Sequence, residues 1–144
     1  MIVVDTNVVV QLLFGGAQRL ALQRLRARDP EWGAPAILLS ELRNVVVGHV
    51  RRGTITERRA VDMTEDASTL LAGRISGVSP RETIAVALEC HLSAYDAEFV
   101  VLARRLRVPL ATLDRAILGG APDVAVPPAV LAERLEGSSP EHFQ

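Results

Sequence analysis

The chain of 144 residues contains no lysine, so all 16 of its basic side chains are arginine, and 17 acidic residues oppose them. The formal net charge of −1 therefore provides no global field that would attract a nucleic acid. The planar guanidinium group suits phosphate oxygens, but a lysine-free chain rich in Ala and Val is also typical of a GC-rich genome. The composition favours a GC-rich genome as the explanation, but it does not exclude phosphate binding.

Cysteine, histidine and aromatic residues are scarce as well. A single cysteine, Cys90, excludes an internal disulfide and a cysteine-rich zinc site, and its apolar neighbours predict a buried thiol. The three histidines, His49, His91 and His142, have neither the spacing of a metal-binding pair nor the partners of a catalytic triad. Aromatic residues form 3% of a chain that is 49% hydrophobic, so the core must consist of Val, Leu, Ile and Ala.

Long apolar segments are missing. No uninterrupted run of about 20 apolar residues exists, which argues against a membrane span. The hydrophobic N-terminus lacks a basic segment and contains Asp5, so it predicts a core strand and helix instead of a signal peptide. We therefore expect a protein of the cytoplasm with no membrane partner.

Short apolar runs alternate with segments of helical spacing. The expected strands cover residues 2–4, 31–34, 74–78, 108–113 and 124–126. The expected helices cover residues 6–28 with a break at the Gly15-Gly16 pair, then 37–52, 56–72, 80–91, 93–107, 115–118 and a short stretch after Pro128. This alternation predicts one α/β domain with a mostly parallel sheet over residues 1–126. Residues 127–144 are expected to form a C-terminal extension, with a loose tail from Gly137 onward.

Two of these helices have clear start signals. Ser79 and Glu82 form a capping box around Pro80, which suits the first helical position. Ser93 and Asp96 form a similar pair at the start of the following helix. Both helices should therefore begin directly after their serine.

Aspartates close two of the predicted strands. Asp5 follows the first strand and Asp114 follows the strand at 108–113. Ligands of open α/β sheets bind outside the carboxyl ends of the strands, where these two carboxylates would meet if the strands are parallel. Asp also caps helices well after a strand, and for either residue alone this simpler role is favoured.

Asp96 and Glu41 are harder to explain as local structure. Asp96 extends the apolar stripe that contains Phe99 toward the start of its helix, although it also completes a capping box. Glu41 lies about 40° around its helix from Val45, on the edge of an apolar face. An ionised carboxylate there needs a cation or strong donors, and an arginine such as Arg43 or Arg52 is one alternative.

Taken together, Asp5, Glu41, Asp96 and Asp114 predict a metal site. Four neighbouring carboxylates repel one another and raise their pKa values unless a cation is present. Their hard oxygen atoms suit Mg²⁺ or Mn²⁺, which retain water molecules that can attack a phosphodiester. The sequence leaves open whether one ion or two would bind.

The surroundings of these acids resemble the motifs of PIN-domain nucleases, and their order and spacing resemble those of VapC-type toxins from bacterial toxin–antitoxin pairs. The similarity covers residues 1 to about 126. The matching motifs are Val-Val-Asp5-Thr6-Asn7, Leu39-Ser40-Glu41-Leu42, Leu92-Ser93-Ala94-Tyr95-Asp96 and Pro109-Leu110-Ala111-Thr112-Leu113-Asp114. The resemblance implies a three-layer α/β/α fold and a Mg²⁺- or Mn²⁺-dependent endoribonuclease that acts on structured or translational RNA.

The resemblance also implies residue roles and partners. Asp5, Asp96 and Asp114 match the family's metal-site acids, and Glu41 matches the remaining active-site carboxylate. Asn7 and Thr112 match polar positions that orient carboxylates or water. The implied partners are an RNA substrate, a VapB-type antitoxin and a second copy of the chain.

Alternatives remain open. A strand-terminal Asp5 also fits a phosphatase nucleophile, although the second Asp expected two residues later is Asn7 and no lysine is present. A PIN-like RNA-binding or scaffold module without a toxin role is another possibility. The arginine runs at residues 51–52, 58–59 and 104–107 either contact RNA phosphates or form ordinary solvated helix faces.

Overall fold

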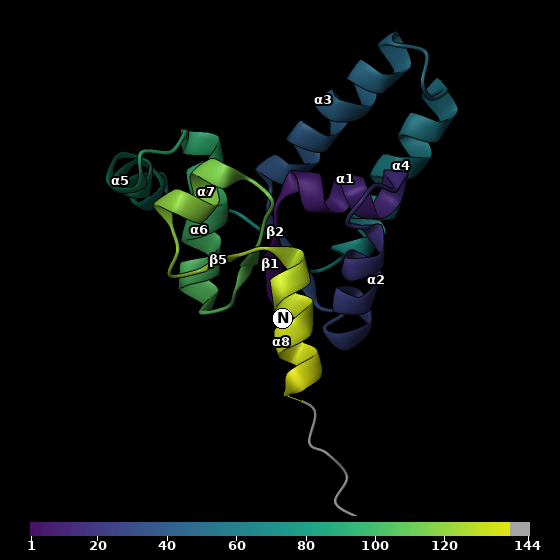
Figure 1. Ribbon diagram of the computed structural model, residues 1–144. Helices are drawn as coiled ribbons and strands as arrows, with labels where there is room; N and C mark the ends of the chain where they lie inside the picture. Colours follow the sequence, from purple (N-terminus) through teal and green to yellow (C-terminus); the bar gives the residue numbers. More distant parts are fainter. Residues whose placement is uncertain (139–144) are drawn as a thin grey trace, which may run out of the picture.

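The computed structural model describes residues 1–138 (Figure 1). The elements follow in the order β1 (Ile2–Val4), α1 (Thr6–Phe14), α2 (Arg19–Arg28), β2 (Trp32–Pro35), α3 (Ile37–Arg51), α4 (Glu57–Leu70), β3 (Ile75–Ser76), α5 (Pro80–Cys90), α6 (Ala94–Leu106), β4 (Leu110–Ala111), α7 (Arg115–Gly120), β5 (Ala125–Val126) and α8 (Pro128–Gly137). This order confirms the predicted alternation. Three strands are shorter than expected, because only the paired residues belong to the ladder.

The strands form one five-stranded parallel sheet in the order β3-β2-β1-β4-β5. The central strand β1 pairs with β2 on one side and with β4 on the other, where Val4 lies opposite Ala111. All three residues of β1 are buried, which explains its unbroken apolar sequence. The expected mostly parallel sheet is therefore confirmed and is parallel throughout.

Helices cover both faces of this sheet. In Figure 1, α5, α6 and α7 lie on one side of the strands, and α1 to α4 with α8 lie on the other. Helix α6 packs directly on β1, β2 and β4, and α8 packs on α2. The α3–α4 pair forms a helical hairpin that extends beyond the sheet at the upper right of Figure 1. The result is the three-layer α/β/α arrangement that the resemblance implied.

The core is aliphatic, as the composition requires, with Trp32 and Phe99 as its largest fully buried side chains. Cys90 is free and buried, as predicted. Leu106, the last residue of α6, is 37% exposed because the helix ends there. None of the helices within residues 1–138 is long and apolar enough to cross a membrane.

The predicted helix starts are also confirmed. Ser79 accepts a hydrogen bond from the backbone N–H of Glu82, with Pro80 in the first turn, and Ser93 accepts one from the backbone N–H of Asp96. Each serine side chain thereby satisfies a backbone donor that has no partner within its helix. The start of α6 is important for function because it positions Asp96.

The boundary between a domain at 1–126 and an extension at 127–144 stays a prediction. Within the described residues, α8 contributes the buried side chains of Leu131 and Ala132 to the same core as the rest of the chain. The expected loose tail lies mostly outside the described residues, and so does His142.

Candidate active site

The order of the strands locates the candidate site. From the central strand β1 the chain moves outward through β2 to β3, and then returns to the other side of β1 for β4 and β5. The helices that follow β1 and β4 consequently leave toward opposite faces of the sheet. This divergence opens a crevice at the carboxyl ends of these two strands, the usual ligand position in open α/β sheets.

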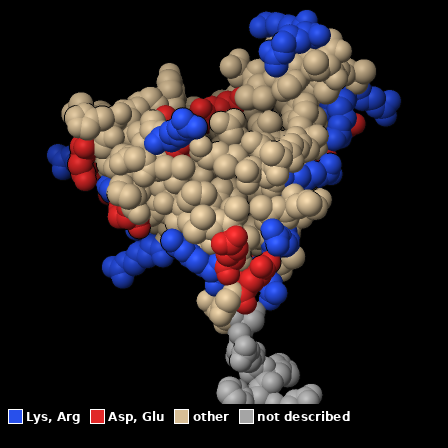
Figure 2. Space-filling view, in the orientation of Figure 1, with Lys and Arg blue, Asp and Glu red and all other residues tan. Residues whose placement is uncertain are grey.

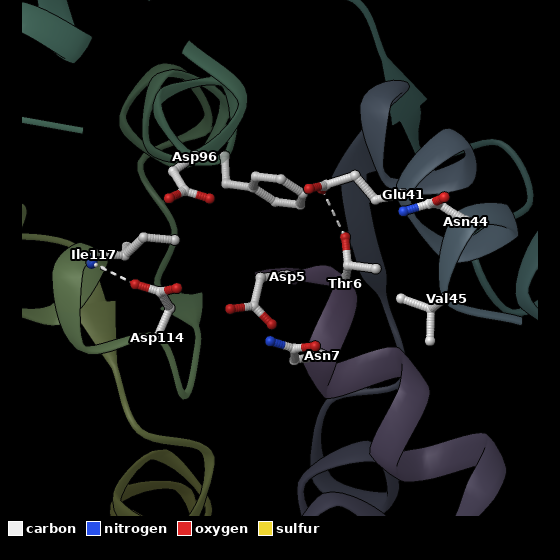
Figure 3. Close-up of a pocket in the computed structure, with 10 residues that line it drawn as sticks. Asp5, Thr6, Asn7, Glu41, Asn44, Val45, Asp96, Asp114 and Ile117 are labelled. Atoms are coloured by element: carbon white, nitrogen blue, oxygen red, sulfur yellow. Dashed lines mark hydrogen bonds between the residues drawn. The ribbon is translucent and has the colours of Figure 1, made fainter. Parts of the chain in front are cut away.

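A pocket of about 190 Å³ occupies this crevice (Figure 3). Its walls come from the ends of β1 and β4 and from α1, α3, α6 and α7. All four predicted carboxylates line it, and so does Asn7. The lining residues are Asp5, Thr6, Asn7, Glu41, Asn44, Val45, Asp96, Phe99, Asp114 and Ile117. The expectation that the four acids meet in one pocket is therefore confirmed, whereas their chemical roles remain predictions.

Asp5 lies at the centre of the pocket and is 5% exposed. One carboxylate oxygen, Oδ1, accepts a 3.0 Å hydrogen bond from the backbone N–H of Val8 and so caps α1. The other, Oδ2, accepts a short hydrogen bond from the hydroxyl of Thr112. A carboxylate has about four acceptor positions, so Asp5 can be a helix cap and still offer lone pairs to the pocket.

Thr112 connects the two strand-end aspartates. Its fully buried hydroxyl donates to Asp5 and accepts a 3.0 Å hydrogen bond from the backbone N–H of Asp114. The side chain of Asp114 in turn caps α7 by accepting a 3.0 Å hydrogen bond from the backbone N–H of Ile117. The simple capping role is thus correct for both aspartates, and it does not exclude a second role in the pocket.

Asp96 and Asp114 line one side of the pocket, as Figure 3 shows, while Glu41 reaches it from the opposite side on α3. Asp96 is half-buried near the start of α6. Glu41 is also half-buried and accepts a 2.8 Å hydrogen bond from the hydroxyl of Thr6. None of the ion pairs found within residues 1–138 involves Glu41, so the alternative of a structural arginine partner is wrong.

The carboxylates perturb one another. The pKa of Asp5 is raised to about 6, chiefly by burial and also by the negative charges of Asp114 and Asp96, while the hydrogen bonds from Thr112 and Val8 act in the opposite direction. Burial, followed by the charge of Asp114, raises the pKa of Asp96. The pKa of Glu41 is raised by burial and then by the charges of Asp96 and Glu98. The pocket thus holds acids that would be stabilised by a cation.

Among residues 1–138, no basic side chain lines the pocket. Carboxylate oxygens without a protein cation are suitable ligands for Mg²⁺ or Mn²⁺. Within residues 1–138, however, no three acidic, histidine or cysteine side chains are arranged to hold one ion together. The donor set therefore fits an ion that contacts one or two carboxylates directly and retains water in its other positions.

Several residues near the pocket were not predicted from the sequence. Thr6 lies within the Asp5-Thr6-Asn7 motif, and Asn44 follows Glu41 by three positions on the same helix face, which is a usable signal. Glu98 does not line the pocket, but its charge acts on Glu41. Its proximity to a helix 57 positions away in the sequence could not be deduced from local patterns.

Comparison with known proteins agrees with this geometry. The PIN domain family model matches residues 2–119, and the chain therefore belongs to the PIN-domain family. PIN domains are generally nucleases.

Two solved structures share the fold. PAE2754 from Pyrobaculum aerophilum is similar with a TM-score of 0.75 and 20% identity, over 95% of this chain and 97% of that one. A toxin–antitoxin complex from Klebsiella pneumoniae is similar with a TM-score of 0.66 and 24% identity, over 89% of this chain and 98% of that one. No curated protein matches the chain.

Proposed function

We propose that this protein is a Mg²⁺- or Mn²⁺-dependent endoribonuclease that serves as the toxin of a VapBC-type toxin–antitoxin pair. The observation that carries the proposal is the meeting of Asp5, Glu41, Asp96 and Asp114 in one pocket, which no basic side chain of the described residues lines. Keeping four carboxylates ionised in one pocket is unfavourable without a bound cation, so the arrangement favours a cation-binding site.

Asp5, Asp96 and Asp114 would hold the metal, in part through water molecules. When bound, the metal neutralises charge on the phosphodiester and lowers the pKa of a water molecule. The pocket volume of about 190 Å³ is below the usual 300–1,000 Å³ of small-molecule sites. It suits an ion, its water and one phosphodiester, while the attached nucleosides would lie outside.

The residues around the acids keep them in place. Thr112 holds Asp5 against rotation and, through the backbone N–H of Asp114, maintains the spacing between the two strand ends. Thr6 orients Glu41 across the pocket. Because its pKa is raised, Glu41 is a better proton acceptor than an ordinary glutamate, so we assign it the proton of the attacking water. Asn7 is exposed beside Asp5 and can orient water or a carboxylate.

The partners follow from the same pocket. A VapB-type antitoxin that brings a guanidinium group would satisfy these carboxylates and exclude the metal. The similarity in fold to a protein of the Klebsiella pneumoniae toxin–antitoxin complex supports such a partner. A homodimer and a location in the cytoplasm, where RNA substrates are found, complete the proposal.

The decisive experiment is RNA cleavage by purified protein with Mg²⁺ or Mn²⁺, with EDTA and with the Asp5→Asn variant. We expect cleavage with metal, none with EDTA and none by the variant. Asn is as good a helix cap as Asp, so α1 should form normally in the variant, and circular dichroism can verify its fold. Equal cleavage by both proteins would mean that this pocket is not the active site.

A further inference from the structure

The arginine runs, which are equivalent in the sequence, differ in the structure. In the run at 104–107, the guanidinium of Arg104 donates to both carboxylate oxygens of Asp123, at 2.9 and 3.0 Å, and lies 3.8 Å from Glu89. Arg105 donates to the backbone carbonyl of Gly77 at 3.3 Å. These two side chains join α6 to neighbouring segments, so the run has a structural role.

The other two runs meet at the free end of the α3–α4 hairpin, in a group that we call the arginine tip: Arg51, Arg52, Arg58 and Arg59. Arg51 ends α3, Arg52 is its C-cap, and Arg58 and Arg59 lie in the first turn of α4. All four are exposed, and no hydrogen bond or ion pair of their guanidinium groups is found with the described residues. Figure 2 shows basic atoms gathered over this end of the hairpin, at the upper right.

Helix stability explains the positions of only two of these four arginines. Cations are favourable at the end of a helix, where Arg51 and Arg52 lie, because the helix dipole is negative there. At the start of a helix the dipole is positive, so Arg58 and Arg59 are placed unfavourably, next to the single acid of that turn, Glu57. A local arrangement that opposes stability without a structural gain is expected at functional surfaces.

The arginine tip and the pocket are connected by one helix. Glu41 lies in the second turn of α3 and Arg51 ends it, so the tip begins roughly 15 Å farther along the helix axis at 1.5 Å per residue. In Figure 2 acidic atoms lie in the hollow between the base of α3 and the α6–α7 side, with basic atoms beside them on the left, while the basic tip projects above. A phosphodiester chain that enters the acidic pocket is repelled there, so it needs cations elsewhere on the same side of the molecule.

We propose that the arginine tip binds backbone phosphates of the RNA substrate. A strand within a duplex advances about 3.4 Å per phosphate, so a separation of roughly 15 Å places the bound phosphates a few nucleotides from the cleaved bond. This inference rests on the proposed ribonuclease function. Contacts to phosphates position a nucleic acid without reading its sequence, so the tip should contribute affinity and not base preference.

The test compares two double variants with the same loss of charge. Arg58→Gln with Arg59→Gln removes half of the tip, and Arg24→Gln with Arg26→Gln removes two exposed arginines of α2, which runs away from the tip in Figure 1. Binding of a fluorescein-labelled single-stranded RNA of about a dozen nucleotides is measured by anisotropy in EDTA over a range of salt concentrations. Thermal melting of each variant verifies its fold.

Affinity falls as salt rises, so the slope of log affinity against log salt is negative. In the tip variant, which loses two phosphate contacts, we expect this slope to become less steep by about 1.4, at about 0.7 per single-strand contact. In the α2 variant it should stay unchanged. In cleavage assays with Mg²⁺, the tip variant should show a higher KM and an unchanged kcat on this RNA. A trinucleotide can place one phosphodiester in the pocket but cannot reach the tip, so on this substrate wild type and variant should behave alike.

If the tip variant had the same salt dependence of RNA affinity as wild type, the inference would be overturned. A tip variant that lost only the binding of a protein partner would overturn it as well, since the tip would then bind protein and not RNA. An equal decrease in both double variants would also overturn it, because the effect would then come from net charge alone. If the wild-type protein did not cleave RNA, the proposed function would fail separately, since the binding measurement does not depend on cleavage.

Discussion

Asp5 and Asp114 have the same local structure and different surroundings. Each follows a strand of the parallel sheet and caps the next helix through a 3.0 Å hydrogen bond from the third residue after it. Asp5 is buried at the centre of the pocket and both of its oxygens accept hydrogen bonds, whereas Asp114 is partly exposed at the crevice wall. Asp5 directly follows the central strand β1 and is 5% exposed, and this burial makes its charge costly.

This difference shows that the pKa of a strand-end aspartate is raised by its position in the sheet and not by its sequence motif. Burial is the largest cause of the raised pKa of Asp5, ahead of any neighbouring charge. A buried carboxylate held on two sides is preorganised for a cation, whereas a partly exposed one can exchange its partners for water. We therefore expect the two residues to respond unequally to the same substitution.

The largest effect is expected from the two asparagine variants in cleavage. Asp5→Asn should lower kcat/KM by at least about 1000-fold, the upper range for one preorganised electrostatic group. Asp114→Asn should lower it by about 10- to 100-fold, as for residues that orient others, because water can replace part of its role. Single-turnover cleavage at saturating Mg²⁺ measures both losses. Equal losses would show that burial does not distinguish the two aspartates.

The next effect concerns stability and pH. In the folded protein the pKa of Asp5 is about 6, above the ordinary 3.8, so the folded state binds this proton more tightly. Stability from this group is therefore present below about pH 4 and is lost as pH rises to about 6, by about 3 kcal/mol in the metal-free protein. Urea unfolding of wild type and Asp5→Asn in EDTA over this pH range measures the difference, since groups far from the pocket contribute equally to both.

The same loss should be reversed by the metal. At pH 7, Mg²⁺ that binds only the folded state should raise the melting temperature of wild type more than that of Asp5→Asn. If Asp5→Asn had the same pH dependence of stability and the same response to Mg²⁺ as wild type, the assignment of the buried charge to Asp5 would be contradicted.

A smaller effect is expected at Thr112, which links the two aspartates. Thr112→Val keeps the shape but leaves Oδ2 of Asp5 and the backbone N–H of Asp114 without their partner. Activity should decrease by about 10- to 100-fold, and the free energy of unfolding by about 1–3 kcal/mol. Thr112→Ser retains the hydroxyl and should recover most of the activity. Failure of the serine to do so would assign the effect to packing.

The smallest effect is expected at Thr6, which orients the fourth acid. Thr6→Val removes the hydrogen bond to Glu41, and activity should decrease by up to about 10-fold, because Glu41 is half-buried and water can replace the hydroxyl. The decrease should appear in kcat, with the apparent affinity for Mg²⁺ nearly unchanged. Thr6→Ser is the matched control, and a loss shared by both variants would contradict an orienting role.

Local patterns predicted much of the fold. The order of strands and helices, the caps at Ser79 and Ser93, and the meeting of Asp5 with Asp114 follow from chain-local rules and from the geometry of parallel sheets. The strand at 108–113 was predicted too long, because only Leu110 and Ala111 pair in register with the neighbouring strands. The convergence of Asp96 and Glu41 was suggested by polar residues on apolar helix faces.

The sequence by itself determined the sheet, the helix starts and the four acids, because these depend on periodicity and on contacts within a few residues. Tertiary structure decided which aspartate is buried, since Thr112 meets Asp5 across 107 positions of the chain. It also decided that Glu41 binds Thr6 and not an arginine, and that Arg104 is paired while the arginine tip projects into solvent. Burial and long-range partners set the energy of a charge, and both arise only when distant segments pack together.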